Sequence, residues 1–174
     1  MDDEYDEYDG VEPAADGFPV TYIWDVRSLA APKQTGIYKS SAHSVDHNQY
    51  VIDGYSMQSN YGAGFRVLDV SSIPSDPTGA GVEEVAFFDV YPEDDSAPLG
   101  GVVDFVGSWS SYAYFKSGFI FVNTIERGGF VIKMKNRRRG WDYGKGRGKP
   151  GRPGNGKKWG DGKWDGGKWK PWTA

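Results

Sequence analysis

The fold is decided by the stretch Phe65-Arg66-Val67-Leu68-Asp69-Val70-Ser71-Ser72, which resembles the earlier stretch Thr21-Tyr22-Ile23-Trp24-Asp25-Val26-Arg27-Ser28. Each copy predicts a strand that ends in Asp-Val and is followed by a turn with Pro and Gly. We expect the Asp to cap the strand end by accepting hydrogen bonds from nearby backbone N–H groups. A third unit, residues 118–123, carries Asn123 in place of the Asp.

Further short runs around these copies also predict strands, because they hold β-branched or aromatic residues between Gly, Pro, Asp or Ser. No stretch shows an apolar period of 3.6 residues over three turns, so little helix is expected. The nine predicted strands are Val20–Val26, Gly36–Lys39, Gln49–Ile52, Tyr55–Ser59, Phe65–Val70, Glu84–Val90, Tyr112–Phe115, Phe119–Asn123 and Phe130–Met134.

Repeats of short strands at this spacing are typical of β-propeller blades. We therefore predict an all-β fold, a partial β-propeller of two to three blades of short antiparallel strands, over residues 18–134. Residues 1–17 form an acidic N-terminal segment, expected to be solvated, and residues 135–174 a disordered basic tail. A closed propeller typically has four to eight blades, so the repeat domain is expected to be incomplete.

Charge divides the chain in the same way. Residues 1–134 hold 7 Lys and Arg against 21 Asp and Glu, whereas residues 135–174 hold 13 Lys and Arg against 3 Asp. The absence of Cys excludes disulfide frameworks, Cys-ligated zinc and thiol catalysis. The sequence contains neither a signal-peptide pattern at Met1 nor a run of 18 apolar residues.

The tail is rich in Gly, Lys, Arg, Pro and Trp, and Lys-Trp recurs every five residues. That spacing matches neither the helix nor the strand period, so no single face forms. Alternating cations and indole rings suit polyanions, either cell-wall or matrix polysaccharide or, as a less favoured alternative, nucleic acid. The other interpretations are that the tail folds back on the chain's own acidic head and that it is a non-specific soluble spacer. The candidate polyanion-binding residues are Arg137, Arg138, Arg139, Lys158, Trp159, Lys163, Trp164, Lys168 and Trp169.

Five further motifs occur in order along the chain. They are Asp46-His47-Asn48-Gln49-Tyr50-Val51, Gln58-Ser59-Asn60-Tyr61-Gly62-Ala63-Gly64-Phe65-Arg66-Val67-Leu68-Asp69-Val70, Phe88-Asp89-Val90-Tyr91-Pro92-Glu93-Asp94-Asp95, Gly107-Ser108-Trp109-Ser110-Ser111-Tyr112 and Ile125-Glu126-Arg127-Gly128. Together they resemble the choice-of-anchor B family, whose members contain LVIVD-type repeats. The resemblance covers roughly residues 1–134.

This resemblance implies a secreted or cell-surface β-propeller with a variable C-terminal region, and some members carry labels that mention a regulatory P domain. The family's biochemical activity is not established, so the resemblance implies a fold and a location rather than a mechanism. Members are usually longer, with several blades before this point, and we therefore expect a missing N-terminal half. The tail matches no anchor type, because it lacks the apolar run of a membrane or GPI anchor.

Asp46, His47 and Asn48 form the most unusual polar cluster of the β-rich part, and in a propeller they would face the central channel. Either they bind a ligand or metal, with Asp46 setting the His47 tautomer, or they hydrogen-bond to strand ends and turns. With only two His, a His₃ zinc site is excluded for this chain alone.

Calcium fits the acidic head better than zinc, since hard cations prefer several oxygen ligands. The candidate calcium ligands are Asp2, Asp3, Glu4 and Asp6, although the EF-hand pattern fails here. Glu93-Asp94-Asp95 is a second candidate, or a solvated loop.

Enzyme signatures are weak. No G-x-S-x-G motif is present, because Gly107-Ser108-Trp109-Ser110-Ser111 places Trp109 where the nucleophile would stand. We therefore expect a non-enzymatic extracellular or cell-surface module for adhesion, scaffolding or ligand binding. The alternative is a carbohydrate-active or other hydrolase with a central metal or carboxylate site near His47. No catalytic residue is assigned.

Overall fold

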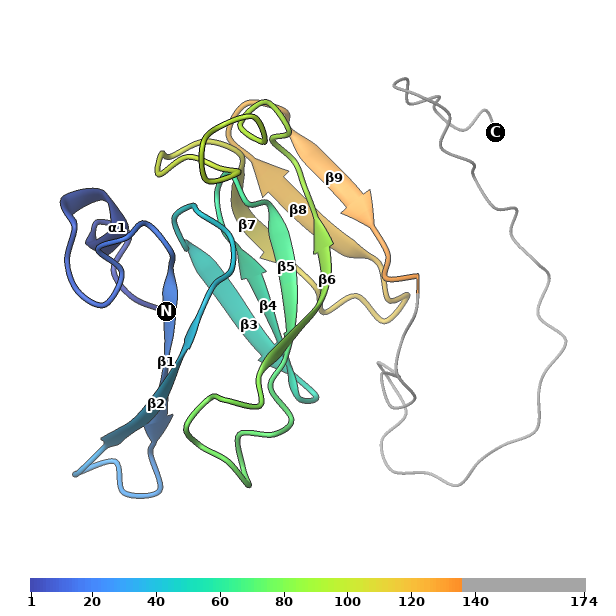
Figure 1. Ribbon diagram of the computed structural model, residues 1–174. Coiled ribbons are helices and arrows are strands. Elements are labelled where there is room, and N and C mark those ends of the chain that lie inside the picture. Colours follow the sequence, from blue (N-terminus) through green and yellow to red (C-terminus); the bar gives the residue numbers. More distant parts are fainter. Residues whose placement is uncertain (136–174) are drawn as a thin grey trace, which may run out of the picture. The chain divides into compact units, whose positions relative to one another are not determined.

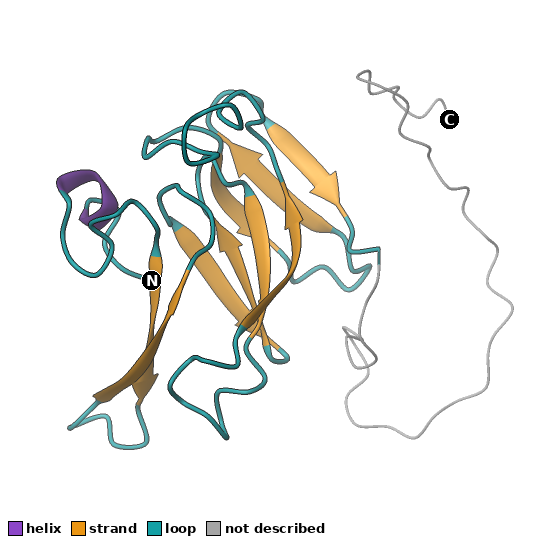
Figure 2. Cartoon of the chain, in the orientation of Figure 1, coloured by secondary structure: helices purple, strands orange, loops and turns teal. Residues whose placement is uncertain are grey.

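The computed structural model describes residues 1–135 of the chain, all of which lie in the first of two compact units, Met1–Gly144 (Figure 1). Strands joined by loops make up nearly all of these residues, and the single short helix among them lies near the N-terminus (Figure 2). The predicted all-β character is confirmed. The elements are α1 (Asp6–Asp9), β1 (Val20–Asp25), β2 (Lys33–Lys39), β3 (Asn48–Ile52), β4 (Tyr55–Ser59), β5 (Phe65–Asp69), β6 (Glu83–Phe88), β7 (Ser108–Tyr112), β8 (Ile120–Thr124) and β9 (Gly129–Ile132).

The strands of the described part form three antiparallel sheets, in each of which strands adjacent in sequence pair. We name them sheet A (β1-β2), sheet B (β3-β4-β5-β6) and sheet C (β7-β8-β9). Eight of the nine predicted strands coincide with observed ones to within a few residues. The seventh, predicted at Tyr112–Phe115, lies earlier, at Ser108–Tyr112. Serine is neither β-branched nor aromatic, so the serines of this segment did not give it the residue pattern from which strands are predicted.

The internal repeat is visible as matching backbone geometry in sheets A and B. Ile23 and Val67 are equivalent in the two repeats, and a register shift follows each of them. The predicted Asp caps are also present: Asp25 Oδ1 accepts from Arg27 N, and Asp69 Oδ1 from Ser71 N, both at 3.0 Å. β1-β2 is therefore the structural counterpart of β5-β6.

The third repeat unit is placed differently from the prediction. Strand β8 is the second strand of sheet C and leads into a tight hairpin, closed by a 2.9 Å bond from Thr124 N to Gly128 O. The equivalent bond in sheet B, from Asn60 N to Gly64 O, closes the β4-β5 hairpin. Strand β8 thus corresponds to β4, and Asn123 is not the counterpart of Asp69.

Sheet B packs between its two neighbours. On one face its buried side chains Met57, Phe65 and Val67 join Ile120 and Val122 of sheet C in the main apolar core. Its other face is of mixed character, because the buried Leu68 lies on it beside Gln58 and Arg66, and it contacts sheet A. There Gln58 Nε2 donates to Thr21 Oγ1 over 2.9 Å, and Ile37 N in β2 donates to Thr78 O, which follows β5. Figure 1 shows the three sheets as successive groups of strands.

The N-terminal segment 1–17 is not the solvated extension that its acidity predicted. Its backbone continues sheet A at one point, because Asp2 N donates to Val20 O. Glu7 and Ala14 are buried, and Gly10 ends α1 with a left-handed φ of 70°. The prediction rested on charge alone and was wrong, because apolar groups and backbone hydrogen bonds between the acidic residues hold the segment in place.

Within the described residues, no helix has the length and apolar character needed to cross a membrane.

Candidate functional site

His47 lies where three separate parts of the chain meet. Its Nε2 atom is 3.2 Å from Glu4 Oε1 of the N-terminal segment. Its ring packs edge-on against Tyr61, which follows β4, and stacks on Trp109 of β7, with centroids 5.3 Å and 5.0 Å apart. The Tyr61 hydroxyl donates to the other Glu4 oxygen over 3.2 Å. These contacts bring together the two sites predicted separately around His47 and around Glu4.

Trp109 owes its position to a β-bulge. The register between β7 and β8 shifts between Ser108 and Ser110, so Trp109 has no partner residue across the ladder. Bulges re-aim side chains in this way. The indole stays 47% exposed while it stacks on His47. The pair therefore presents an aromatic surface to solvent beside the Glu4 carboxylate, whose side chain is 37% exposed.

Further aromatic rings extend this surface along the N-terminal segment. Phe105 contacts Tyr61, Tyr5 and Tyr8 at centroid distances of 5.3, 5.5 and 6.0 Å. Tyr5 and Tyr8 are more than half exposed. We call Glu4, His47, Tyr61 and Trp109, together with Tyr5, Tyr8 and Phe105, the aromatic site.

Two buried carboxyl groups, Asp46 and Glu7, are the sequence neighbours of His47 and Tyr8 of the aromatic site. Asp46 is 2% exposed, and burial raises its pKa to about 8, with a further contribution from the charge of Asp2. Glu7 is 5% exposed, and burial, followed by the charges of Asp2, Asp46 and Asp6, also raises its pKa to about 8. Both groups thus favour the protonated state at neutral pH, and this keeps unpaired charge out of the interior.

Several buried polar atoms here have no hydrogen-bond partner among the described residues. Such atoms are exceptional in folded proteins. Most of them are acceptors or hydroxyl groups. They include Asp2 Oδ1, both Glu7 carboxylate oxygens, Asp46 Oδ1, His47 Nδ1, Asn48 Oδ1 and Asn60 Oδ1, with the hydroxyls of Ser44, Ser59, Ser108 and Ser111.

The remaining acidic-head candidates have local structural roles. Asp3 Oδ1 accepts from Tyr5 N, and Asp6 Oδ2 accepts from Asp3 N, so both carboxylates stabilise the turn that begins α1. Asp2 Oδ2 accepts from Val20 N over 2.6 Å. Within residues 1–135, no three His, Asp or Glu side chains are gathered as a metal site would require. The calcium hypothesis therefore gains no support from this arrangement.

Of the second acidic candidate, Glu93-Asp94-Asp95, the residues Glu93 and Asp94 line an open hollow of about 330 Å³. Glu93 forms an ion pair with Arg127, whose guanidinium group lies 5.8 Å from the Tyr91 ring centroid. Asp94 is buried, accepts from Val102 N, and has a raised pKa because of that burial. Glu93 and Asp94 thus hold the loop before β7 together, whereas Asp95 is exposed.

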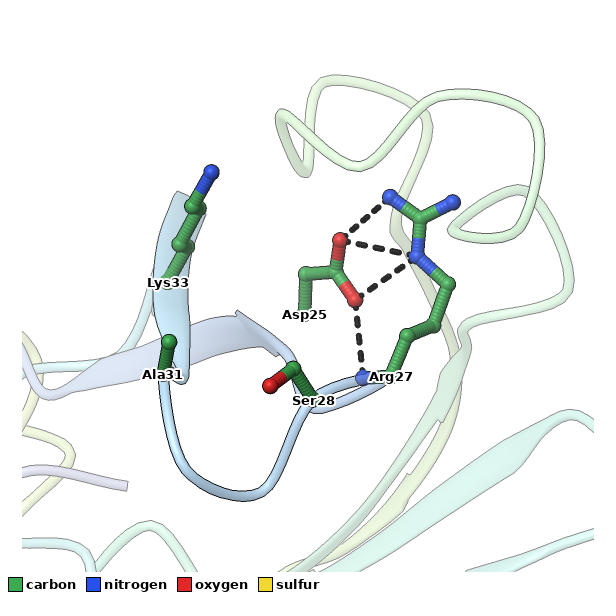
Figure 3. A pocket seen from close by; sticks show the side chains of 5 residues that line it. All are labelled: Asp25, Arg27, Ser28, Ala31 and Lys33. Carbon is green, nitrogen blue, oxygen red and sulfur yellow. Dashed lines mark hydrogen bonds and ion pairs between the residues drawn. The ribbon is translucent and has the colours of Figure 1, made fainter.

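A larger open hollow, of about 370 Å³, lies at the β1-β2 connection (Figure 3). Arg27 donates to both carboxylate oxygens of Asp25, and this contact lowers the Asp25 pKa to about 2. In Figure 3 no dashed line joins Lys33 to that ion pair. The hollow is thus the inside of a turn that Asp25 stabilises by capping the end of β1. Its lining offers no set of polar groups that converge on one point.

Sequence reasoning found Asp46, His47, Asn48 and Glu4 but missed Glu7, Tyr61 and Trp109. Trp109 was visible as a bulky aromatic in a run of serines, a pattern that suggests an unusual strand. Tyr61 has a positive φ of 35°, which only the backbone could show. The predicted tail residues, from Arg137 to Trp169, lie outside the described residues.

No family model, curated protein or solved structure matches the chain.

Proposed function

We propose that the chain is a non-enzymatic, carbohydrate-binding module of a cell-surface β-propeller. The observation that carries the proposal is the half-exposed Trp109 ring stacked on His47, beside the Glu4 carboxylate. Binding sites for small polar molecules combine aromatic walls with a few oriented polar groups. A sugar ring suits this combination, because its C–H face packs on an indole while its hydroxyls donate to a carboxylate.

Hydrogen bonds to neighbouring strands and side chains orient the polar groups of the aromatic site. The backbone N of His47 donates to Ser59 O over 3.0 Å, which fixes the start of β3. Glu4 is held by Tyr61 and His47 together. A site whose polar groups are already oriented loses less entropy on binding. Because Asp46 and Glu7 are almost completely buried, we assign them to support of the site rather than to acid–base catalysis.

The propeller and the family resemblance belong to this proposal. Three face-packed antiparallel sheets, with a bulge at equivalent positions of two repeats, support a blade architecture of the choice-of-anchor B type. That family's extracellular or surface location suits a polysaccharide ligand. The basic tail would add non-specific attraction to acidic polymers, since residues 135–174 carry 13 Lys and Arg against 3 Asp.

Binding of the full chain to insoluble cellulose and chitin, measured by depletion from solution, tests the aromatic site. Trp109→Ala should weaken binding about tenfold, the loss that corresponds to roughly 1.4 kcal/mol. The matched control is Trp24→Ala, because Trp24 is similarly exposed at 51% but lies on sheet A. Equal binding by both variants and the unmodified chain, or no binding to either polymer, would refute the assignment.

The tail is tested separately with pectin, an acidic polysaccharide. The full-length variant Lys158→Gln/Lys163→Gln/Lys168→Gln should bind pectin more weakly at 50 mM salt, and the difference should shrink as salt screens the charges. Its binding to cellulose or chitin should not change. A variant that binds pectin as well as the unmodified chain does would exclude this role of the three lysines.

A further inference from the structure

The Glu4 carboxylate is held in place and still has acceptor positions for a ligand. One oxygen lies 3.2 Å from His47 Nε2, and the other accepts from the Tyr61 hydroxyl over 3.2 Å. Tyr61 remains a donor, because burial, followed by the charge of Glu4, raises the pKa of its hydroxyl. A carboxylate has about four acceptor positions, so each Glu4 oxygen keeps one for a further bond. The side chain is 37% exposed, and the group that completes the site must therefore be a hydrogen-bond donor from solvent.

The turn that carries Glu4 is rich in carboxylates. Asp3 and Asp6 belong to the same turn, because Asp6 Oδ2 accepts from Asp3 N and Asp3 Oδ1 accepts from Tyr5 N. Among residues 1–135, no Lys or Arg lies within ion-pair distance of Glu4, Asp3 or Asp6. The His47 imidazole is the basic side chain that contacts this group. A cationic donor is attracted to such a surface, whereas an anionic one is repelled.

Exposed aromatic rings lie beside the same carboxylate. Trp109 stacks on the His47 ring that contacts Glu4, and its indole is 47% exposed. Tyr5, the next residue after Glu4, is 55% exposed. Aromatic faces attract cations, and Trp does so most strongly. The same faces pack on the C–H face of a sugar ring, so a sugar that also carries a cation would use both properties of the site.

We propose that the aromatic site selects amino sugars whose nitrogen is a free ammonium group, such as the glucosamine units of deacetylated chitin. This inference rests on the proposed carbohydrate-binding function and names the class of sugar. The ammonium group has three N–H donors for the open acceptor positions of Glu4, while the sugar ring packs on Trp109. Acetylation removes the charge and leaves one N–H, so N-acetylglucosamine is the matched comparison ligand.

Calorimetric titration of the full chain with glucosamine and N-acetylglucosamine oligosaccharides of equal length measures the selection. In mildly acidic buffer, which keeps the sugar amine protonated, the glucosamine oligosaccharide should bind about tenfold more tightly, because a charge-assisted hydrogen bond is roughly twice as strong as a neutral one. Equal affinity for the two ligands would overturn the selection of an ammonium group and leave carbohydrate binding standing. Binding of neither ligand would refute the proposed function, and this inference with it.

Glu4→Gln keeps the size of the side chain and removes its charge. The variant should lose the preference for glucosamine and still bind the N-acetylglucosamine oligosaccharide, which also shows that it is folded. Glu12→Gln is the matched control, because Glu12 is exposed in the same N-terminal segment, and it should keep the preference. An equal loss in both variants would show that overall acidity attracts the ligand, and the assignment to Glu4 would be wrong.

Spermidine distinguishes the ammonium of a sugar from that of any other amine. It carries charged N–H donors without a sugar ring, and at equal concentration it should not displace the glucosamine oligosaccharide from the full chain. Displacement would show that charge alone decides binding, and would overturn the assignment to amino sugars.

Discussion

The buried carboxyl of Asp46 makes a quantitative prediction about pH and stability. Its pKa is about 8 in the folded chain and near 3.8 when exposed to water. Between those values the folded state holds a proton that the unfolded state has released, so the free energy of unfolding falls as the pH rises from about 4 to about 8. One pKa unit corresponds to about 1.4 kcal/mol, which sets a ceiling of about 4 kcal/mol for Asp46 between pH 4 and pH 7.

Asp46→Asn removes the titrating proton and keeps the shape of the side chain. At pH 5 the unfolded chain has already released this proton whereas the folded chain keeps it, so the variant should already be the more stable protein, by about 1.6 kcal/mol. From pH 5 to pH 8 this advantage of the variant should grow by up to about a further 4 kcal/mol. The ceiling is not doubled for Glu7, because the charge of Asp46 itself contributes to the raised pKa of Glu7, and the two acids titrate together.

Urea unfolding followed by tryptophan fluorescence at half-unit steps from pH 5 to pH 9 measures this difference. Asp95→Asn is the control, since Asp95 is exposed and the same chemical change there should give a curve parallel to that of the unmodified chain. If the free energy of unfolding of Asp46→Asn changed with pH in parallel with that of the unmodified chain, burial would not keep Asp46 protonated.

Three further predictions concern packing and turns and are measured by thermal or urea unfolding. Met57→Ala should cost about 2–5 kcal/mol, because Met57 is fully buried between sheets B and C. Gly36→Ala should cost about 1–3 kcal/mol, since its new methyl group would overlap the Thr78 backbone, whereas a cost near zero would contradict the packing of that loop on β2. Asp69→Ala should cost about 1–2 kcal/mol through loss of its two bonds to Ser71, and an unchanged midpoint would show that the strand cap is dispensable.

The local pattern of the sequence was sufficient for the strands and the caps. β-branched and aromatic runs between Gly, Pro and Asp predicted the segments that became β1, β4 and β5 almost to the residue, because those propensities act within a few residues. The Asp-Val repeat predicted the caps at Asp25 and Asp69 for the same reason. The local pattern did not predict the position of β7, because its serines form a strand only through the residues that they face in the folded chain.

The site depended on contacts that no local pattern contains. The sequence singled out His47 and Glu4 separately, 43 positions apart, and only the fold placed Nε2 of one within 3.2 Å of Oε1 of the other. The bulge that exposes Trp109 arises from the pairing of β7 with β8, which is a property of two strands rather than of one. The burial of Glu7 likewise follows from what the N-terminal segment packs against.

Composition, charge and short-range propensity thus determined that this chain is an all-β body with a basic tail. Those quantities depend on residues close together in sequence, where backbone preference and turn chemistry operate. The tertiary structure decided which sheets stack, which acids lose contact with water and which rings meet. Burial and long-range contact depend on the whole arrangement, so the raised pKa of Asp46 and the aromatic site around His47 appear only once the sheets are assembled.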